Sequence, residues 1–568
     1  MTAAQILRRA PVAAAFGADL HPVLRRVYAA RGVTDDRDLD LSLQHLLPVS
    51  SLAGVDAAAH LLAAHRERGR VLIVGDFDAD GATSSALMVR ALRALRFGHV
   101  DFLVPDRFRF GYGLTPQIVA CAAERQPTLI VTVDNGVSSV DGVEAARALG
   151  IAVLVTDHHL PGRQLPRAEV IVNPNLPGST FASPALAGVG VAFYVIAALA
   201  AALPPGDFNA ADLLDLVALG TVADVVTLDR NNRILVAQGL RRIRAGRCVA
   251  GIHALLQAGA RRFGQATAAD LGFAVAPRLN AAGRLADMGV GILCLLADSQ
   301  ATAEALAAQL SRLNEERREI ERHMQTEAVE LAAAVQAGGE ESAGLCLFDE
   351  TWHQGVVGLV AGRIKEKLHR PVIAFACAAD GSLRGSARSV AGVHVRDALD
   401  SIAARNPGLI EKFGGHALAA GLTIGRENLP AFRAAFAAEV AARAGLGAIA
   451  GVIHSDGELA AAEMSMQTAQ AIAAGGPWGQ GFAEPVFDGE FAVLESRIVG
   501  GRHLKLKLRA AAPQGAAFDA IAFGYVEAGA AAAPPAAGAR VAAAYRLEVN
   551  EYQGNSRLQL NCQHLKSL

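Results

Sequence analysis

Short runs of apolar, largely β-branched residues recur between residues 70 and 175, and polar residues and a helical stretch follow each run. Strands that are apolar along their whole length and alternate with helices are typical of a parallel sheet covered on both faces. The pattern therefore predicts an α/β domain built on a parallel sheet. Its expected strands are Val71–Gly75, Val100–Pro105, Leu129–Val133, Ala152–Thr156 and Val170–Val172.

Residues 300–336 contain neither glycine nor proline and are rich in helix-forming residues. They predict one unbroken helix of roughly 50 Å, which is long enough to bridge two lobes. Gly338-Gly339 ends this helix, and a second α/β segment follows at 343–445. Its expected strands are Leu345–Phe348 and Val372–Ala376.

After Gly451 apolar residues alternate at period two between glycine-containing turns, which predicts a small all-β unit that we expect to form a barrel. Its expected strands are Val486–Val499, His503–Leu508, Ala520–Phe523, Val541–Val549 and Arg557–Cys562. The expected domains are an N-terminal extension (1–45), the parallel-sheet domain (46–298), the bridging helix (299–338), the second α/β domain (339–446) and the β unit (447–568).

The composition narrows the functional classes only in part. No run of about 18 apolar residues has the character of a membrane span, and the Ala-rich segment Val189–Leu203 is expected to be a buried helix. No signal peptide is recognised, and six cysteines without C-x-x-C spacing favour a reducing cytoplasm. The net charge of −2 does not indicate nucleic-acid binding, which depends on where Lys and Arg lie.

Ligand-type residues follow four of the predicted strands at their carboxyl ends, where parallel sheets bind ligands. They are Asp76-Phe77-Asp78-Ala79-Asp80, Asp106-Arg107, Asp134-Asn135-Gly136 and Asp157-His158-His159. Taken alone, the first is most simply an acidic surface loop and the third a capped turn. On one shared rim they indicate metal binding, because carboxylates this close repel each other unless a cation neutralises them.

Asp224 adds an acid within an apolar segment, where an unpaired carboxylate is costly. Carboxylates and imidazole without thiolate suit Mn²⁺ or Mg²⁺ better than structural zinc. The sequence therefore favours two divalent metal ions and phosphate hydrolysis. The candidate metal ligands are Asp76, Asp78, Asp80, Asp134, His158 and Asp224.

The Asp-His-His at 157–159 resembles the motif that gives the DHH phosphoesterase superfamily its name. Within it, further segments resemble, in the same order, the RecJ family of bacterial single-strand-specific 5′→3′ exonucleases. These segments are 76–84, 104–114, 132–136, 218–226, 276–285, 352–367, 385–389, 413–421, 476–487 and 503–508. The resemblance implies a DHH phosphoesterase domain, a DHH-associated domain and a C-terminal oligonucleotide-binding (OB) barrel.

The resemblance also implies how the ligands divide between the metals. Asp78 and Asp134 would hold one ion, with Asp76 near it. Asp80, Asp134, His158 and Asp224 would hold the second. Asp134 would thus be the bridge and part of the catalytic group with His159 and Asp157. His159 would contact the scissile phosphate, and Asp157 would orient the histidines.

Several residues in the matching segments are expected to contact phosphate or DNA, although an isolated loop arginine is ordinarily just solvated. They are Arg107, Arg278, Asn280, Arg284, Ser386, Arg388 and His416. Lys505 and Lys507 alternate with leucines, which gives either a cationic groove or a solvated strand face. For Trp478, Phe482 and Phe487 core packing is favoured over base stacking.

The resemblance implies a substrate of single-stranded DNA with a 5′ end, which threads between two lobes and releases 5′ mononucleotides in DNA repair and recombination. A helicase, a single-strand-binding protein and a monomeric state are further expectations; a membrane is not. One alternative is a DHH phosphodiesterase acting on short oligoribonucleotides, phosphoadenosine phosphate or cyclic dinucleotides, and a pyrophosphatase is a weaker one. The non-enzymatic alternative is a RecJ-like scaffold that binds single strands during replication.

Overall fold

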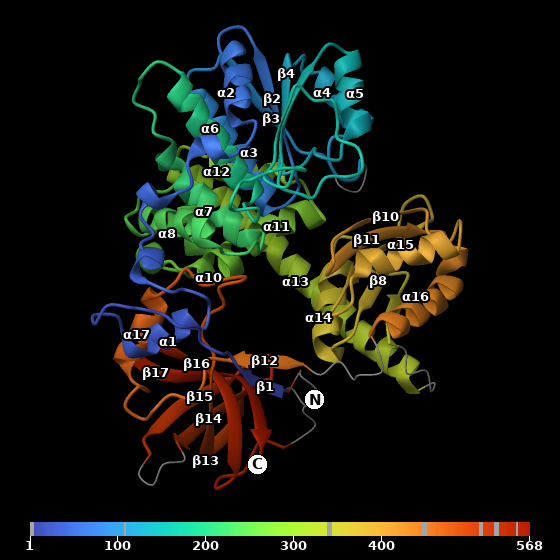
Figure 1. The fold of residues 1–568 in the computed structure, drawn as a ribbon. Coiled ribbons are helices and arrows are strands. Elements are labelled where there is room, and N and C mark those ends of the chain that lie inside the picture. Colours follow the sequence, from blue (N-terminus) through green and yellow to red (C-terminus); the bar gives the residue numbers. More distant parts are fainter. Residues whose placement is uncertain are drawn as a thin grey trace. The chain divides into compact units, whose positions relative to one another are not determined.

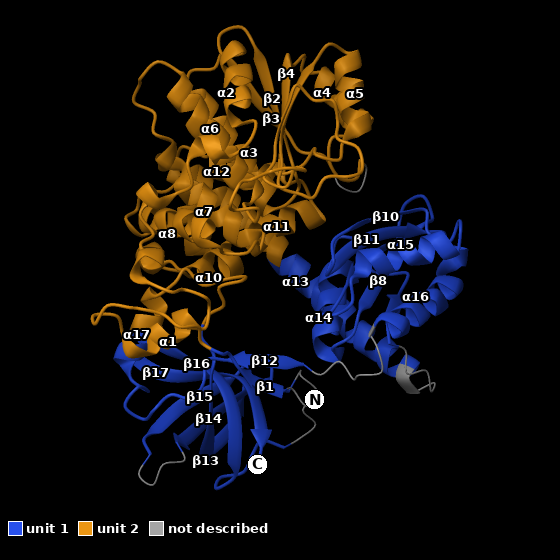
Figure 2. Cartoon of the chain, in the orientation of Figure 1, with its two compact units in different colours: residues 1–10, 315–470, 485–568 blue, residues 11–314, 471–484 orange. Residues whose placement is uncertain are grey.

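The computed structural model describes residues 5–106, 110–337, 343–444, 451–510, 515–526, 533–552 and 555–568. The chain divides into two compact units (Figure 2). Unit 1 comprises residues 1–10, 315–470 and 485–568, and unit 2 comprises residues 11–314 and 471–484. The five domain boundaries expected from the sequence remain a prediction.

Unit 2 contains a five-stranded parallel sheet in the order β3-β2-β4-β5-β6 (Figure 1). Its strands are β2 (Arg70–Gly75), β3 (His99–Leu103), β4 (Leu129–Val133), β5 (Ala152–Thr156) and β6 (Val170–Val172). All neighbouring strands pair in parallel. The parallel sheet is thus confirmed, and β4, β5 and β6 have the predicted bounds, because a strand buried on both faces is apolar from end to end.

Helices cover both faces of this sheet and bury its central strands β2, β4 and β5, whereas the edge strand β3 is partly exposed. Leu72 of β2 packs with Ile118 of α4 and Val143 of α5 in one cluster, while α3 packs on β2 as well. The helical elements of unit 2 include α1 (Pro22–Ala29), α2 (Val55–Ala64), α3 (Ala79–Ala94), α4 (Pro116–Ala123), α5 (Val140–Ala148), α6 (Gly188–Ala202), α7 (Leu214–Ala223), α8 (Arg230–Arg244), α9 (Ala250–Ala258), α10 (Ala268–Asp270), η6 (Leu271–Val275), α11 (Ala276–Leu285) and α12 (Gly289–Leu296). The buried helix expected at Val189–Leu203 is α6.

The predicted bridging helix is α13 (Gln300–Ala337), which begins in unit 2 and continues into unit 1. The second α/β domain has a mixed sheet in the order β10-β11-β9-β8-β7, in which β7 and β8 alone pair in parallel. Its elements are β7 (Leu345–Phe348), α14 (Val357–Leu368), β8 (Val372–Cys377), β9 (Leu383–Arg388), α15 (Val395–Arg405), β10 (Lys412–Gly415), β11 (Ala419–Ile424) and α16 (Leu429–Ala444).

The C-terminal β unit is a closed barrel in the order β13-β14-β15-β17-β16, as the period-two alternation predicts. Its strands are β13 (Phe487–Val499), β14 (His503–Ala510), β15 (Ala517–Ala522), β16 (Arg540–Tyr552) and β17 (Asn555–Ser567). Leu504, Leu506 and Leu508 of β14 point into the barrel and are buried. Two further elements lie before the barrel in sequence, β12 (Val452–Ser455) and α17 (Met466–Ala474).

The N-terminal extension is split between the two units, which the sequence does not predict. β1 (Gln5–Arg8) pairs in parallel with β12, and Arg8 Nη2 lies 2.6 Å from Asp488 Oδ2 at the start of β13. In unit 2, Tyr28 of α1 stacks on Trp478 and Phe482. Tyr28, Phe482 and Phe487 are buried in core packing, and Trp478, which stacks on the first two, is half-buried.

Among the described residues no single helix has the length and apolar character needed to cross a bilayer. A bent pair of helical segments, Leu43–Ser51 with Val55–Ala64, passes the same test of length and composition.

Leu72→Ala should lower the free energy of unfolding of unit 2 by about 2–5 kcal/mol, because it leaves a cavity under α4 and α5. Leu72 is 2% exposed, whereas the control Leu149 is 57% exposed, so Leu149→Ala should cost less than about 0.5 kcal/mol. Urea unfolding followed by hydrogen exchange of β2 and β4 peptides measures unit 2 separately from unit 1. Equal losses in the two variants would contradict the packing described here.

Candidate metal centre

The acidic segment after β2 forms the first turn of α3, and this local structure fixes its carboxylates. Asp78 is the N-cap of α3, where its Oδ1 accepts hydrogen bonds from the amides of Asp80 and Gly81, each 3.0 Å long. A side chain at Gly81 would clash, because its Cβ would lie 2.5 Å from the carbonyl oxygen of Asp76. Asp76 is buried and its Oδ1 accepts from the amide of Phe77.

The carboxylate of Asp80, a residue of α3, lies at the N-terminus of a second helix, α6. Its two carboxylate oxygens accept hydrogen bonds from the amides of Gly188 (2.7 Å) and Val189 (2.9 Å), which the positive end of the helix dipole reinforces. Burial, and next the charge of Asp78, nevertheless raise the pKa of Asp80 to about 7. The fold therefore holds this carboxylate in place without fully compensating its negative charge.

Asp134 follows β4 and has a left-handed backbone, with φ +61°, which is uncommon outside glycine. It is buried against Gly188, where a Cβ would lie 2.7 Å from both Cβ and Oδ1 of Asp134. Burial, followed by the charges of Asp80 and Asp78, raises the pKa of Asp134 well above its ordinary value. A left-handed turn and a glycine thus allow one more carboxylate to enter an already acidic site.

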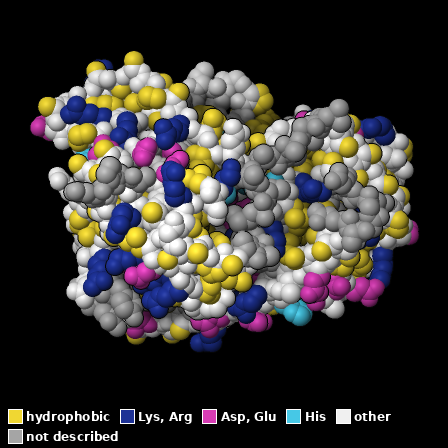
Figure 3. Space-filling model, turned by 90° about the horizontal axis from the view of Figure 1, so that it is seen from below, with side chains coloured by type: hydrophobic (Ala, Val, Ile, Leu, Met, Phe, Trp, Pro, Cys, Tyr) yellow, Lys and Arg dark blue, Asp and Glu magenta, His cyan; other side chains and the backbone are white. Residues whose placement is uncertain are grey.

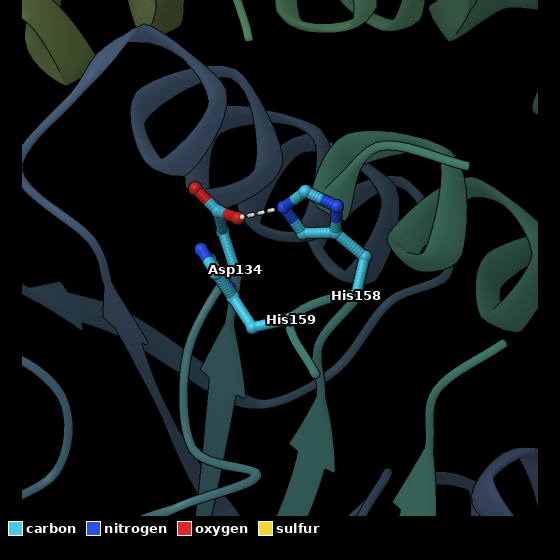
Figure 4. A group of neighbouring side chains, drawn as sticks. All are labelled: Asp134, His158 and His159. Carbon is cyan, nitrogen blue, oxygen red and sulfur yellow. Dashed lines mark ion pairs between the residues drawn. The ribbon is translucent and has the colours of Figure 1, made fainter. Parts of the chain in front are cut away.

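His158 faces two of these acids from the end of β5. Its Nε2 lies 3.1 Å from Asp134 Oδ1 and 3.4 Å from Asp224 Oδ2, and Figure 4 shows the imidazole directed at the Asp134 carboxylate. Asp224 is the C-cap of α7, and burial together with Asp80 and Asp78 raises its pKa well above its ordinary value. The ends of β4, β5 and α7 therefore contribute to one cluster.

Asp157 holds the histidine pair and does not belong to any of the metal groups. Its Oδ1 accepts from His159 Nδ1 (2.7 Å) and from the His158 amide (2.8 Å), and its Oδ2 accepts from the Val137 amide (2.8 Å). Burial is the largest influence on Asp157 and would raise its pKa, but the hydrogen bonds from His159 and Val137 together with the charges of the two histidines lower it. Burial likewise opposes protonation of His159, yet the bond to Asp157 together with the charges of Asp157, Asp76 and Asp224 raises the pKa of His159 to about 9.

The donor atoms fall into three groups, and within each group they all lie within 4.8 Å of one another. The groups are Asp76 with Asp78 and Asp134, Asp80 with His158 and Asp224, and Asp134 with His158 and His159. Asp106, after β3, is exposed and belongs to none of them. A hard donor set of carboxylates with imidazole fits divalent Mn²⁺ or Mg²⁺, and such ions would offset both the burial and the mutual repulsion that raise the pKa values of Asp80, Asp134 and Asp224.

Some supporting residues are not found by sequence reasoning. The side-chain amides of Asn173 and Asn175 donate to the carbonyls of His159 (2.9 Å) and His158 (2.6 Å). Tyr112 places its hydroxyl 3.1 Å from His159 Nδ1 and donates to the carbonyl of Asp134. The sequence signal for the two asparagines is the Asn-Pro-Asn directly after β6, since paired asparagines at a strand end commonly bond backbone groups.

Three family models match this chain: the DHH family, N-terminal domain, over residues 70–221, the DHHA1 domain over 340–442 and the RecJ OB domain over 455–564. The single-stranded-DNA-specific exonuclease RecJ of Salmonella typhimurium is 51% identical over 568 residues, which is 97% of each chain. The chain belongs to the RecJ family. This confirms the resemblance inferred from the motifs, together with the DHH, DHH-associated and OB domains.

RecJ-family structures also share the fold. The crystal structure of RecJ from Thermus thermophilus in complex with Mn²⁺ has a TM-score of 0.79 at 32% identity, and covers 96% of this chain and 76% of that chain. The structure of the same protein in complex with Mg²⁺ has a TM-score of 0.73 at 30% identity, and covers 96% and 75%.

Of the residues expected to contact phosphate, two in this RecJ-family chain make bonds inside unit 2. Arg278 Nε donates to Ser311 Oγ (3.0 Å), and its Nη2 donates to the carbonyl of Ala258 (2.9 Å). Asn280 Oδ1 accepts from the amide of Ala79 (2.8 Å), between the acids of α3. Asn280 thereby holds α11 against the acid segment, whereas Arg278 bonds to α9 and α13. Contact of either residue with DNA remains a prediction, as does that of Arg284 on the same helix.

Ser386, Arg388 and His416 meet at one part of the mixed sheet in unit 1. Arg388 Nη1 donates to Ser386 Oγ (3.0 Å), and a Cβ on Gly358 of α14 would lie 2.9 Å from that oxygen. The His416 amide donates to the carbonyl of Ala419, which pairs with Arg388. Burial lowers the pKa of Arg388. Arg107 lies outside the described residues.

The outer face of β14 is not uniformly cationic. Lys507 pairs with Glu495 on β13 and with Asp519 on β15, whereas Lys505 pairs with Arg497 and Ile521. On the face of the molecule drawn in Figure 3, Lys and Arg are likewise interspersed with acidic and apolar side chains. A DNA contact at Lys505 is therefore better supported by its neighbours than one at Lys507, and both remain predictions.

Gly188→Ala is expected to weaken Mn²⁺ binding by about 10- to 100-fold, the scale of losses when groups that support metal ligands are changed. The added Cβ would lie 2.7 Å from Asp134 and would have to displace it. Gly206→Ala is the matched control, because no atom lies within 4 Å of its added Cβ. Calorimetric titration with Mn²⁺ distinguishes the two variants, and unchanged affinity in Gly188→Ala would argue against a metal ion at Asp134.

Proposed function

We propose that this chain is a metal-dependent exonuclease that degrades single-stranded DNA from the 5′ end, using two divalent ions held at the rim of the parallel sheet. The observation that carries the proposal is the convergence of Asp76, Asp78, Asp134, His158 and Asp224 in a chain of the RecJ family. The Mn²⁺ and Mg²⁺ complexes of the Thermus relative support the choice of metal.

Two of the three groups suggest how the ligands divide. Asp76, Asp78 and Asp134 would hold one ion, and Asp80, His158 and Asp224 would hold the other with Asp134 as the bridge. The short separation of His158 Nε2 from Asp134 Oδ1, 3.1 Å, supports a shared ligand. In this division Asp76 would be a ligand of the first ion, whereas the sequence alone left its role least defined.

Bound divalent ions would activate water and stabilise the attacking and leaving oxygens of the phosphodiester. The chain supplies the rest. Asp157 fixes the orientation of His159, whose protonated ring would contact the scissile phosphate as a cation. Asn173 and Asn175 hold the backbone of the histidine pair at the end of β5. Ser386 and Arg388 would bind a phosphate of the strand, since their hydroxyl and guanidinium lie side by side.

The alternatives are less well supported. Phosphodiesterases for short oligoribonucleotides or cyclic dinucleotides need no OB domain, whereas the RecJ OB model matches residues 455–564. A non-catalytic scaffold would not require so many carboxylates at one buried rim, because their mutual repulsion destabilises the fold without a cation. A pyrophosphatase would need neither the barrel nor the second α/β domain.

We further infer that the protein works in the cytoplasm as a monomer, in repair and recombination, with a helicase and a single-strand-binding protein that expose its substrate. The six cysteines are free, which is consistent with a reducing compartment.

End-labelled DNA tests the proposal directly. Single strands labelled at the 5′ end should release labelled mononucleotides at once in Mn²⁺ or Mg²⁺, while strands labelled at the 3′ end shorten gradually. Blunt duplexes of the same sequence should persist, and chelation of the metal should stop digestion. Equal digestion of duplex, or first release from the 3′ end, would refute the proposed polarity and strand preference.

Asp134→Ala should reduce digestion by more than about 100-fold, because loss of a bridging ligand exceeds the 10- to 100-fold effect of changing a ligand's supporting partner. Strand binding should be largely preserved, since most of the residues expected to contact phosphate lie outside the acid cluster. Asp207→Ala, an exposed acid-to-alanine change, is the control. Digestion rates and fluorescence anisotropy with labelled DNA measure the two properties. Metal-dependent digestion retained by Asp134→Ala would sink the two-metal assignment.

A further inference from the structure

A π-helical turn exposes one large aromatic ring near the acid cluster. η6 joins α10 to α11, and its apolar residues Leu271 and Val275 are fully buried, whereas Phe273 is 83% exposed. π-helical turns are rare and frequently occur at functional sites. Because this ring buries so little apolar area, packing of the fold does not account for its position.

The run from α10 to α11 contacts two elements that carry acids of the metal centre, at points on either side of this ring. Before Phe273, Gly272 packs on α7, where a Cβ would lie 3.2 Å from Val222, two residues before Asp224. After it, Asn280 of α11 accepts the amide of Ala79 in the acid segment. Seven residues of helix advance about 10 Å along the axis, so Phe273 lies within about two helical turns of the acid segment.

A second apolar side chain is exposed directly beside the cluster. Val225, the residue after Asp224, is 64% exposed and has a left-handed backbone with φ +61°. That conformation is a true outlier for a β-branched residue and costs about 1–2 kcal/mol. Strain of this kind persists where the surrounding structure requires it, and it is concentrated at functional sites.

We propose that Phe273, together with Val225, forms a nucleobase-binding site beside the metal centre, in which one unpaired base of the DNA strand stacks on the Phe273 ring. This inference rests on the proposed function and names the substrate group that the site binds. This base-binding site is separate from the residues expected to contact phosphate.

The chemistry of the pair suits a base rather than a phosphate. Phe273 and Val225 offer an aromatic face and an aliphatic edge, and neither can neutralise an anion. Every base has a π-face, so such a site tolerates any sequence, and a base on the ring gains about five- to about 150-fold in affinity by the usual strength of base–aromatic stacking. A base in duplex has both faces covered by its neighbours, so the site selects unpaired strands.

An abasic scan tests the site. A single abasic residue is placed in turn at each of the first six nucleotides from the 5′ end of a single strand, and kcat/KM is measured for the wild type and Phe273→Ala. At one position the abasic residue should lower kcat/KM of the wild type by about five- to about 150-fold. Phe273→Ala should show that loss on intact DNA, with no further loss on the abasic strand.

Three further variants sharpen the test. Phe273→Trp should restore sensitivity at the same position because it keeps a π-face, whereas Phe273→Leu should not. Leu149→Ala, equally an exposed apolar residue, should behave as the wild type. Phe273→Ala that remains as sensitive as the wild type at every position, or a wild type insensitive at all six, would overturn the inference while leaving the exonuclease intact. Absence of digestion by the wild type would instead overturn the proposed function, and this inference with it.

Discussion

Repulsion between carboxylates in a buried site is the constraint on which the rest of this structure depends. Two like charges 4 Å apart near a protein surface repel by about 4 kcal/mol, and Asp80, Asp134 and Asp224 are brought together from three parts of the chain. The raised pKa values of all three acids express the cost of burying their charges, to which this repulsion adds. The fold compensates only part of it, through the two amides of α6 that bind Asp80. What remains is the free energy with which the site attracts divalent cations.

The surrounding elements serve to keep these acids close despite the repulsion. Gly188 and Gly220 bring α6 and α7 against Asp134 and Asp80, at distances that a side chain would prevent. The left-handed turn at Asp134 directs its carboxylate into the same space. By contrast, Asp157 is given four hydrogen bonds from Val137, His158 and His159, so its charge is satisfied by protein donors. Two kinds of buried aspartate, one compensated and the others not, therefore stand side by side with different functions.

The sequence predicts those parts of the fold that local patterns determine. β4, β5 and β6 have the predicted bounds because strands covered on both faces are apolar throughout, and α13 follows from a run without glycine or proline. The metal-site acids were found because parallel strands end at a common edge. The pairing of β1 with β12, about 450 positions apart, has no local signal. The contacts at Gly188 and the bonds of Arg278 and Asn280 within the fold have no local signal either, because tertiary packing sets the partner of a side chain.

A net charge of −2 is compatible with DNA as a substrate, because binding depends on where the charged residues lie on the strands and not on their total number. On β14 the lysines alternate with buried leucines, yet Lys507 faces Glu495 and Asp519 across the neighbouring strands, whereas Lys505 faces Arg497. Acidic register partners therefore offset Lys507, whereas Lys505 and Arg509 on the same strand have none. Selectivity for an unpaired strand must then come from groups that recognise bases and from the metal centre itself, not from a uniformly positive surface.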